Sequence, residues 1–294
     1  MHIFVSFFAV FLIATSSLVA ETPTEFVFNI RQISDSEGSP IDEEGWIQRY
    51  NLDGVSAELD RAAHNTFGAG LLEFAGYFPH QLFTGVYREG NEIHPLVKIT
   101  FVNGILSAEQ DTENILQEIS NTHGGNQIYY VYRPTEGWTI DVYNCILSKL
   151  GFVTPQAATL ALIWKRLIEE MGGPGAGGTI LHFAHSVGGT DSFVAGCLLT
   201  EEEQKMIHVF TFGSPTLIPT NSGFASVTNY VSVRDGVPLF DFFRQVQEFI
   251  TCEGNIRYVG NLWTGYWLVD HLFLYDAYRN EVQKLGLEFL QKYN

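Results

Sequence analysis

Basic side chains are scarce in this sequence. Sixteen Lys and Arg residues stand against 33 Asp and Glu residues, which gives a net charge of -17. This deficit argues against a nucleic-acid ligand, because binding to phosphates depends on clustered positive charge. It also disfavours anionic membrane surfaces, whereas apolar contact with lipid is compatible with it.

Cysteine is scarce as well. The three cysteines, Cys145, Cys197 and Cys252, show no paired spacing such as CxxC, so neither a metal site nor a disulfide framework is supported. We expect all three to pack as small apolar side chains. One disulfide plus a free thiol is the alternative for an exported protein.

Signatures of metals and cofactors are also lacking. His182 and His185 lie three residues apart, a spacing that places them on unlike faces of a strand, and no further His or Cys cluster accompanies them. The Gly-rich segment 172–178 (GGPGAGG) lacks the Lys-Ser/Thr ending of a nucleotide-binding loop. We therefore predict no metal and no cofactor.

A long uncharged run opens the sequence. Residues 3–20 are apolar and end in small residues, and the polar segment 21–25 (ETPTE) follows. This pattern predicts an export signal cleaved near Ala20, and hence a secreted, periplasmic or surface protein. No Lys or Arg precedes the run, and about 18 apolar residues can just span a bilayer, so an uncleaved membrane anchor is the alternative.

The remaining chain is long enough for one large core. With 294 residues and 46% hydrophobic content, a single α/β domain is expected. Residues 21–94 are Gly-rich and irregular, and we interpret them as an N-terminal extension or the first strands of a sheet. Residues 95–294 alternate short apolar runs with amphipathic segments, which predicts a mostly parallel sheet flanked by helices. Nothing in the sequence indicates an oligomeric state.

The predicted elements follow from this alternation. Strands are expected at residues 96–102, 127–132, 179–184, 207–212, 227–233 and 256–259, and helices at 108–120, 139–150, 155–171 and 272–293. Another helix should begin just after Ser186. The long stretch over about 133–178 between two core strands predicts a cap or lid, because insertions are tolerated there.

The segment around Ser186 carries the clearest chemical signal. A nucleophile at the tip of a sharp strand-to-helix turn needs small residues two before and two after it, and Ala184 and Gly188 meet that demand around His185 and Val187. The alternative is a Gly-rich helix cap with a solvated serine. The strand before the turn and the helix after it favour the nucleophile.

These motifs resemble those of a known superfamily. The segment 184–189 (AHSVGG) is similar to the GHSLGG-type nucleophile elbow of α/β-hydrolases, and with 210–215 (FTFGSP) it resembles the fungal-type (class 3) lipases. The resemblance covers roughly residues 95–290, and uncharacterised chlamydial proteins resemble the chain more weakly over the same core. Ala184 departs from the pattern, since Gly is commoner there. The resemblance implies an α/β-hydrolase fold and a serine hydrolase.

The acid and base are sought beyond Ser186, because this fold orders its triad as serine, acid, histidine. His208 and His271 are the two histidines there, and His208 falls inside an apolar strand. His271 opens HLFLYDAY, which resembles the histidine loop of lipases. Asp235 ends a strand and begins DGVP, similar to the Asp-x-Val-Pro segment of class 3 lipases, although it could be a turn former alone. Asp241 is the reserve candidate.

The oxyanion of the expected reaction needs backbone donors. Val187 should supply one N–H from the start of its helix, and the loop Asn103, Gly104, Ile105 should supply another. The loop 103–105 departs from the usual lipase pattern.

We therefore expect hydrolysis of a carboxylic ester or lipid. The aromatic-rich segment 236–250 could line an acyl site or a lid, or be ordinary core. A thioesterase or amidase with the same triad is an alternative, since fold does not fix the leaving group. A non-catalytic exported protein that retains a hydrolase core is another.

Overall fold

The structure is a computed structural model that describes residues 83–105, 107, 109–133, 145, 146, 148, 149, 152–251, 253–260 and 269–293. The predicted export signal or anchor, most of the predicted N-terminal extension and Cys252 lie outside these ranges, so those expectations stay predictions. Within the described ranges, no helix is both long enough and apolar enough to cross a membrane.

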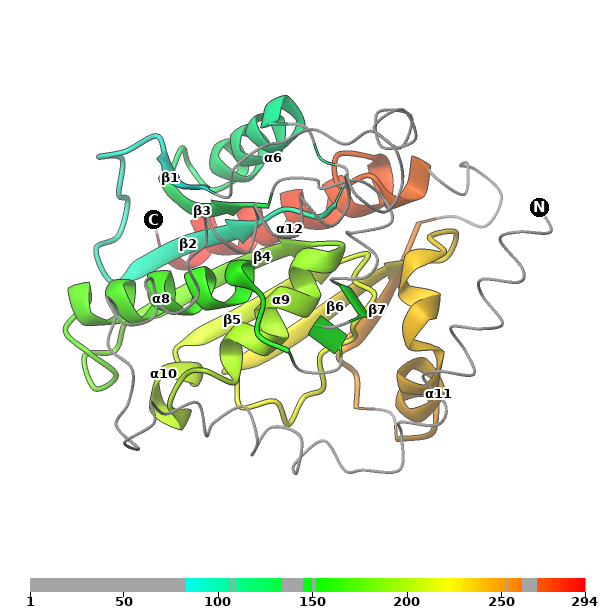
Figure 1. The fold of residues 1–294 in the computed structure, drawn as a ribbon. Helices are drawn as coiled ribbons and strands as arrows, with labels where there is room; N and C mark the ends of the chain where they lie inside the picture. Colours follow the sequence, from blue (N-terminus) through cyan, green and yellow to red (C-terminus); the bar gives the residue numbers. More distant parts are fainter. Residues whose placement is uncertain are drawn as a thin grey trace, which may run out of the picture. The chain divides into compact units, whose positions relative to one another are not determined.

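A seven-stranded sheet forms the centre of the described chain (Figure 1). Its order is β1-β3-β2-β4-β5-β6-β7, in which β1 pairs antiparallel with β3 and every other neighbouring pair is parallel. The strands are β1 (Phe83–Tyr87), β2 (Val97–Val102), β3 (Ile128–Tyr132), β4 (Thr179–His185), β5 (Ile207–Phe212), β6 (Ser226–Ser232) and β7 (Ile256–Val259).

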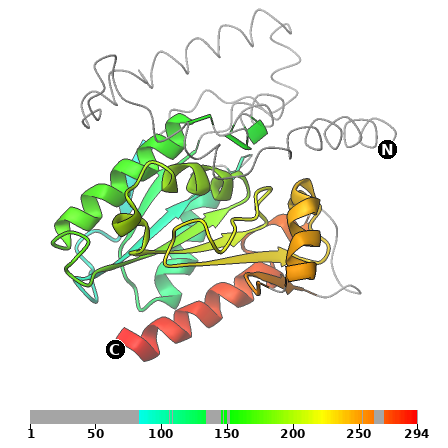
Figure 2. The ribbon, with the colours of Figure 1, turned by 90° about the horizontal axis from the view of Figure 1, so that it is seen from below.

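Helices cover both faces of this sheet (Figures 1 and 2). They are α6 (Glu109–Thr122), α8 (Pro155–Glu170), α9 (Val187–Gly196), α10 (Glu201–Gln204), α11 (Phe242–Thr251) and α12 (Asp276–Tyr293), with short 3-10 helices η1 (Val237–Asp241) and η2 (Val269–His271). One core cluster joins α8 and α9 to the sheet, and a second joins α6 and α12 to its other face.

Strand β2 shows why the sequence folds into two layers around a sheet. All six of its residues are buried. Val97, Ile99 and Phe101 point into the core with α6 and α12, whereas Val102 belongs to the core with α8 and α9. Alternate side chains of a strand face opposite sides, so a central parallel strand with both faces covered buries both sets of side chains, including Lys98 and Thr100.

Helix α8 falls within the stretch for which the sequence predicts a cap or lid. It begins after the N-cap Thr154, whose hydroxyl accepts a hydrogen bond from the Ala157 N–H, with Pro155 at the first turn. Trp164 in its middle is completely buried in the sheet core. Residues 155–170 are therefore a core helix rather than a lid. Residues 134–144 of the same stretch lie outside the described ranges.

The C-terminal part of the chain departs from the sequence-based expectation at two helices. Helix α12 begins at Asp276 rather than at residue 272, because the chain first makes a turn in which the Tyr275 N–H donates to the Leu272 carbonyl. Helix α11 was not expected as a helix at all. The antiparallel strand β1 places the end of the 21–94 segment at the edge of the sheet.

Candidate active site

Ser186 occupies the turn between β4 and α9. Its backbone has φ 53 and ψ -128, a conformation that a residue with a side chain rarely adopts. The Ser186 N–H donates to the Phe212 carbonyl at 2.9 Å, so β5 holds the turn in place. Strain of this kind persists only where the surrounding structure imposes it, and it is concentrated at functional sites.

The residues around the turn must be small for a reason visible in the packing. A Cβ added to Gly188 would lie 2.8 Å from the Val102 carbonyl oxygen and 2.9 Å from that of Asn103. Ala184 is fully buried in the core with α8 and α9. The structure therefore supplies the steric reason for the small residue at position 188.

The structure brings together the three residues that the sequence singles out. His271 Nε2 lies 3.0 Å from Ser186 Oγ, and His271 Nδ1 lies 2.8 Å from Asp235 Oδ2. The Asp235 side chain is fully buried, whereas that of His271 is 21% exposed. Asp235 follows β6, and its Oδ1 accepts the Val237 N–H at 2.8 Å.

A glycine of the FTFGSP segment leaves room for the acid and the base. Gly213 has φ +64, and an added Cβ would lie 2.5 Å from Asp235 Oδ2 and 3.0 Å from His271 Nδ1. A side chain here would therefore displace the contact between carboxylate and imidazole. The resemblance of this motif to lipases does not by itself indicate a role for Gly213.

Two further residues contact this cluster: His185, which the sequence places in the turn without a contact to the base, and Tyr278, which sequence reasoning missed. His185 Nε2 lies 2.8 Å from the backbone oxygen of His271, and burial lowers the pKa of His185 to about 3. The imidazole is therefore neutral and donates its Nε2 proton to that oxygen. The Tyr278 hydroxyl lies 2.6 Å from Asp235 Oδ2. Burial, reinforced by Asp235, raises the pKa of Tyr278, so the phenol keeps its proton.

The loop after β2 runs directly beside the serine. An added Cβ on Gly104 would lie 2.5 Å from Ser186 Cβ and 3.2 Å from its Oγ. The buried Asn103 side chain fixes this loop: its Oδ1 accepts the Arg133 N–H at 2.6 Å, and its Nδ2 donates to the carbonyls of Arg133 (2.8 Å) and Gly104 (2.9 Å). Because a trans peptide directs its C=O and N–H oppositely, the Ile105 N–H points away from the Asn103 amide.

Val187 is the first residue of α9. Its N–H is one of the first-turn groups that have no carbonyl partner within the helix. Val187 therefore directly follows Ser186, and Gly104 of the loop after β2 lies beside that serine. The role of Val187 and of residues 103–105 as oxyanion donors stays a proposal.

The alternative residues lie elsewhere. His208 is at the start of β5, where its Nδ1 lies 2.7 Å from Ser226 Oγ, whereas β5 meets the Ser186 turn at its far end. Asp241 accepts the Leu217 N–H at 2.8 Å through Oδ2. Neither residue therefore occupies the place of the base or the acid beside Ser186.

The expectations about the cysteines and about a metal site concern other parts of the fold. Cys145 and Cys197 are buried thiols without a disulfide. His182 points into the core with Trp164, at a ring distance of 4.8 Å, whereas the His185 ring faces His271 at 5.0 Å. No group of three or more His, Cys, Asp or Glu residues that could hold a metal ion occurs in the described part of the chain.

The strand order, the single antiparallel edge strand and the serine turn after β4 are those of the α/β-hydrolase fold. This is the class that the sheet and the turn define, as the sequence predicted.

Comparison with known proteins adds distant likenesses. No family model and no curated protein matches the chain. Among solved structures, the chain is similar to a cutinase from Trichoderma reesei (13% identity, 93% of this chain and 100% of that one, TM-score 0.41). It is also similar to a dienelactone hydrolase from Anabaena variabilis (13% identity, 73% of this chain and 93% of that one, TM-score 0.43). A third similar structure is an α/β serine hydrolase without a lid from Xanthomonas campestris (11% identity, 72% of this chain and 88% of that one, TM-score 0.42). The finer resemblance to class 3 lipases and to chlamydial proteins stays a prediction.

Proposed function

We propose that this protein is a serine hydrolase that cleaves a carboxylic ester with an apolar acyl chain. The observation that carries the proposal is the pair of hydrogen-bond distances that link Ser186 Oγ to His271 Nε2 (3.0 Å) and His271 Nδ1 to Asp235 Oδ2 (2.8 Å). When a hydroxyl, an imidazole and a carboxylate are hydrogen-bonded in this order, the imidazole can take the proton of the hydroxyl as the oxygen attacks.

The proposed reaction follows from that geometry. His271 Nε2 takes the proton of Ser186 as Oγ bonds to the ester carbonyl carbon, and Asp235 stabilises the resulting imidazolium. The same nitrogen then protonates the leaving alcohol as its bond to the carbonyl carbon breaks, which leaves an acyl-enzyme. A water molecule, deprotonated in turn by His271, attacks the acyl carbon, and His271 returns that proton to Ser186 Oγ as the acyl–Oγ bond breaks, which releases the acid.

The oxyanion would lie between the two backbone segments that flank Ser186. The Val187 N–H begins α9, so the positive end of the helix dipole faces the developing charge. The loop with Gly104 and Ile105 supplies the second donor in this proposal. Losing one such donor typically raises the barrier by about 3 kcal/mol.

An apolar substrate is supported by helix α11, which follows Asp235 through η1. Its outward residues are large and apolar, and each is between 39% and 86% exposed: Phe242, Phe243, Val246, Phe249 and Ile250. The interpretation of this aromatic segment as ordinary core is therefore wrong for α11. Contiguous exposed apolar surface on a protein marks a ligand, membrane or partner site.

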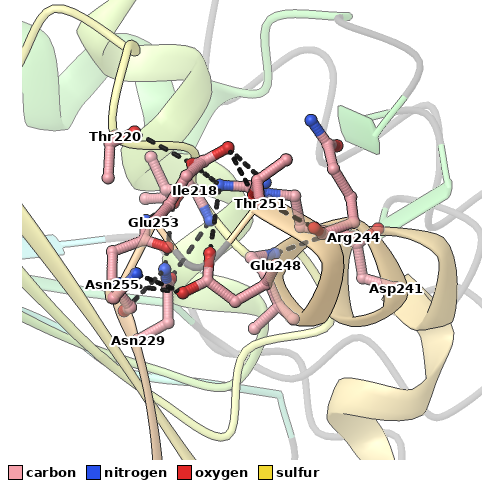
Figure 3. Close-up of polar contacts among 12 residues, drawn as sticks. Ile218, Thr220, Asn229, Asp241, Arg244, Glu248, Thr251, Glu253 and Asn255 are labelled. Carbon is pink, nitrogen blue, oxygen red and sulfur yellow. Dashed lines mark hydrogen bonds and ion pairs between the residues drawn. The ribbon is translucent and has the colours of Figure 1, made fainter.

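The opposite face of α11 is charged and turned inward (Figure 3). Arg244 binds the Glu253 carboxylate at 2.5 Å and 3.3 Å, and this guanidinium lowers the pKa of Glu253 to about 2. Glu248 Oε1 accepts the N–H groups of Gly254 (2.5 Å) and Asn255 (3.1 Å). A surface helix normally buries its apolar face. The reversed orientation of α11 supports a role for the apolar face in substrate contact.

The hydrolase proposal can be tested with a covalent probe. A fluorophosphonate should label the full-length protein, and Ser186→Ala should abolish labelling, because the probe reacts with an activated serine. Hydrolysis of p-nitrophenyl esters should fall in parallel. Equal labelling or equal rates for both proteins would show that Ser186 is not the nucleophile.

The acyl preference can be tested on α11. We expect Ile250→Ser and Phe242→Ser to lower kcat/KM for long-chain p-nitrophenyl esters more than for the acetate ester. Leu287→Ser is the matched control, since Leu287 is 62% exposed on α12, compared with 74% for Ile250. An unchanged ratio of long-chain to short-chain activity in both α11 variants would remove α11 from the substrate site.

A further inference from the structure

We infer that Tyr278 is a positioning residue for the proposed reaction, because its hydroxyl holds the Asp235 carboxylate in the orientation that meets His271. The inference rests on the proposed function. It concerns a residue of the C-terminal helix, which lies far from the serine turn in the sequence.

The direction of the hydrogen bonds at the Tyr278 hydroxyl is fixed by its neighbours. The Ser232 backbone N–H lies 3.1 Å from the hydroxyl oxygen and can only donate. The phenolic proton is therefore left for Asp235 Oδ2, which lies 2.6 Å away. Asp235 Oδ2 is therefore the acceptor of this hydrogen bond, and the short distance is typical of an O–H group bonded to a charged carboxylate.

Asp235 consequently accepts three hydrogen bonds. Oδ2 receives those of His271 Nδ1 (2.8 Å) and Tyr278 (2.6 Å), and Oδ1 receives that of the Val237 N–H (2.8 Å). Three donors stabilise the ionised carboxylate and leave it one rotational position. The other titratable groups that face this cluster are His185 on β4 and Asp270 on η2.

Tyr278 is itself held rigidly. It is completely buried on α12, and its ring contacts Phe212 edge-on at a ring distance of 5.9 Å. Val282 and Phe289, further along α12, are buried in the same core. The helix therefore fixes the hydroxyl, whereas Asp235 lies in a turn after β6. A rigid donor on a helix preorganises the carboxylate for its contact with the imidazole.

Removing the hydroxyl has a definite expected effect. Without it, Oδ2 keeps one donor instead of two, so its charge is less neutralised and it stabilises the imidazolium form of His271 more strongly. The acid limb of the kcat/KM profile should move to higher pH. The carboxylate also gains rotational freedom, so kcat should fall about tenfold, the size expected for a lost hydrogen bond to a charged group, with KM little changed.

The decisive comparison is Tyr278→Phe against Tyr230→Phe in the full-length protein. Tyr230 is 1% exposed, its ring stacks on the same Phe212 at 4.9 Å, and its hydroxyl interacts with Arg257 rather than with Asp235. Tyr278→Phe should lower kcat and shift the acid limb, whereas Tyr230→Phe should leave both in place. Equal behaviour of the two variants would overturn the inference.

A measurement without turnover separates this inference from the proposed function. The titration midpoint of the His271 imidazole, followed by NMR on 15N-histidine-labelled protein and assigned with His271→Asn, should rise in Tyr278→Phe and not in Tyr230→Phe. If the wild-type protein fails to react with the fluorophosphonate probe while this midpoint still moves, the proposed function is wrong and the contact is right. If the probe reacts and the midpoint is unmoved, the role of Tyr278 is wrong.

A second variant covers the case in which Tyr278→Phe does not fold. Protein that carries 3-fluorotyrosine has more acidic phenols, which donate more strongly to the carboxylate. The His271 midpoint should then move to lower pH, opposite to the Phe variant. A midpoint that does not move, or that rises, would contradict the inference.

Discussion

Gly104→Ala gives the sharpest test of the loop beside the serine. The added Cβ would lie 2.5 Å from Ser186 Cβ, whereas carbon atoms in good contact are about 3.5 Å apart. The loop and the serine must therefore separate by about 1 Å. Asn103 resists that movement, because both its Oδ1 and its Nδ2 are hydrogen-bonded to the backbone of Arg133.

The expected cost follows from that displacement. A shift of about 1 Å at a reacting group can lower the rate by about 100-fold, which corresponds to about 2.7 kcal/mol in the barrier. Overpacking should also lower the free energy of unfolding by about 1–3 kcal/mol. The rate should therefore fall in protein that still folds.

Two assays follow the effect: the kcat/KM for p-nitrophenyl esters, and the rate of fluorophosphonate labelling with the melting temperature measured on the same samples. Gly175→Ala is the matched control, since an added Cβ there meets no atom within 4 Å. If Gly104→Ala reacts at the same rates as Gly175→Ala, the placement of this loop against the nucleophile is refuted.

Three further predictions concern stability. Ser186→Gly should unfold with a free energy about 1 kcal/mol higher than Ser186→Ala in denaturant titrations, because glycine tolerates the positive φ of this turn; equal values would mean that the turn is unstrained. Arg133→Met should cost about 3–5 kcal/mol in the same assay, since it leaves the buried Asp191 carboxylate without the guanidinium that lies 2.6 Å from it; a loss below 1 kcal/mol would contradict the buried pair. Burial lowers the pKa values of His182 and His185 to about 3, so only the unfolded chain takes up these protons between pH 6.5 and pH 3. Stability should be complete above pH 6.5 and lower by about 2 kcal/mol per histidine at pH 5, measured as the free energy of unfolding against pH; a flat profile would contradict it.

The sequence predicts the sheet well because its signals are local. Strands β5 and β7 have the predicted bounds, β2, β3 and β4 differ from prediction by one residue at one end, and β6 is shifted by one residue at both ends. Buried parallel strands are short apolar runs, and these are visible without any knowledge of neighbours. The turn at Ser186 is local as well, since strand, small residues and helix follow one another within a few positions.

Tyr278 could not be found in the same way. Its contact with Asp235 joins residues 43 positions apart, and a tyrosine in a helix packed on a sheet is ordinary core on sequence grounds. The exposure of helix α11 could not be predicted for a different reason. Aromatic side chains are expected to be buried, so an exposed apolar face with charged Arg244 and Glu248 underneath is the opposite of the usual pattern.

The helices of this protein are attached to the sheet by two different kinds of force. Apolar side chains such as Trp164 and Phe289 hold α8 and α12 on the sheet, whereas Arg244 and Glu248 bind α11 to the segment 253–255 that leads into β7. Hydrophobic attachment weakens on cooling, and the desolvation cost of ion pairs falls on warming. Temperature will therefore act unevenly across the molecule. Cooling should weaken the packing of α8 and α12 on the sheet more than the contacts of α11, whereas warming should favour the contacts of α11.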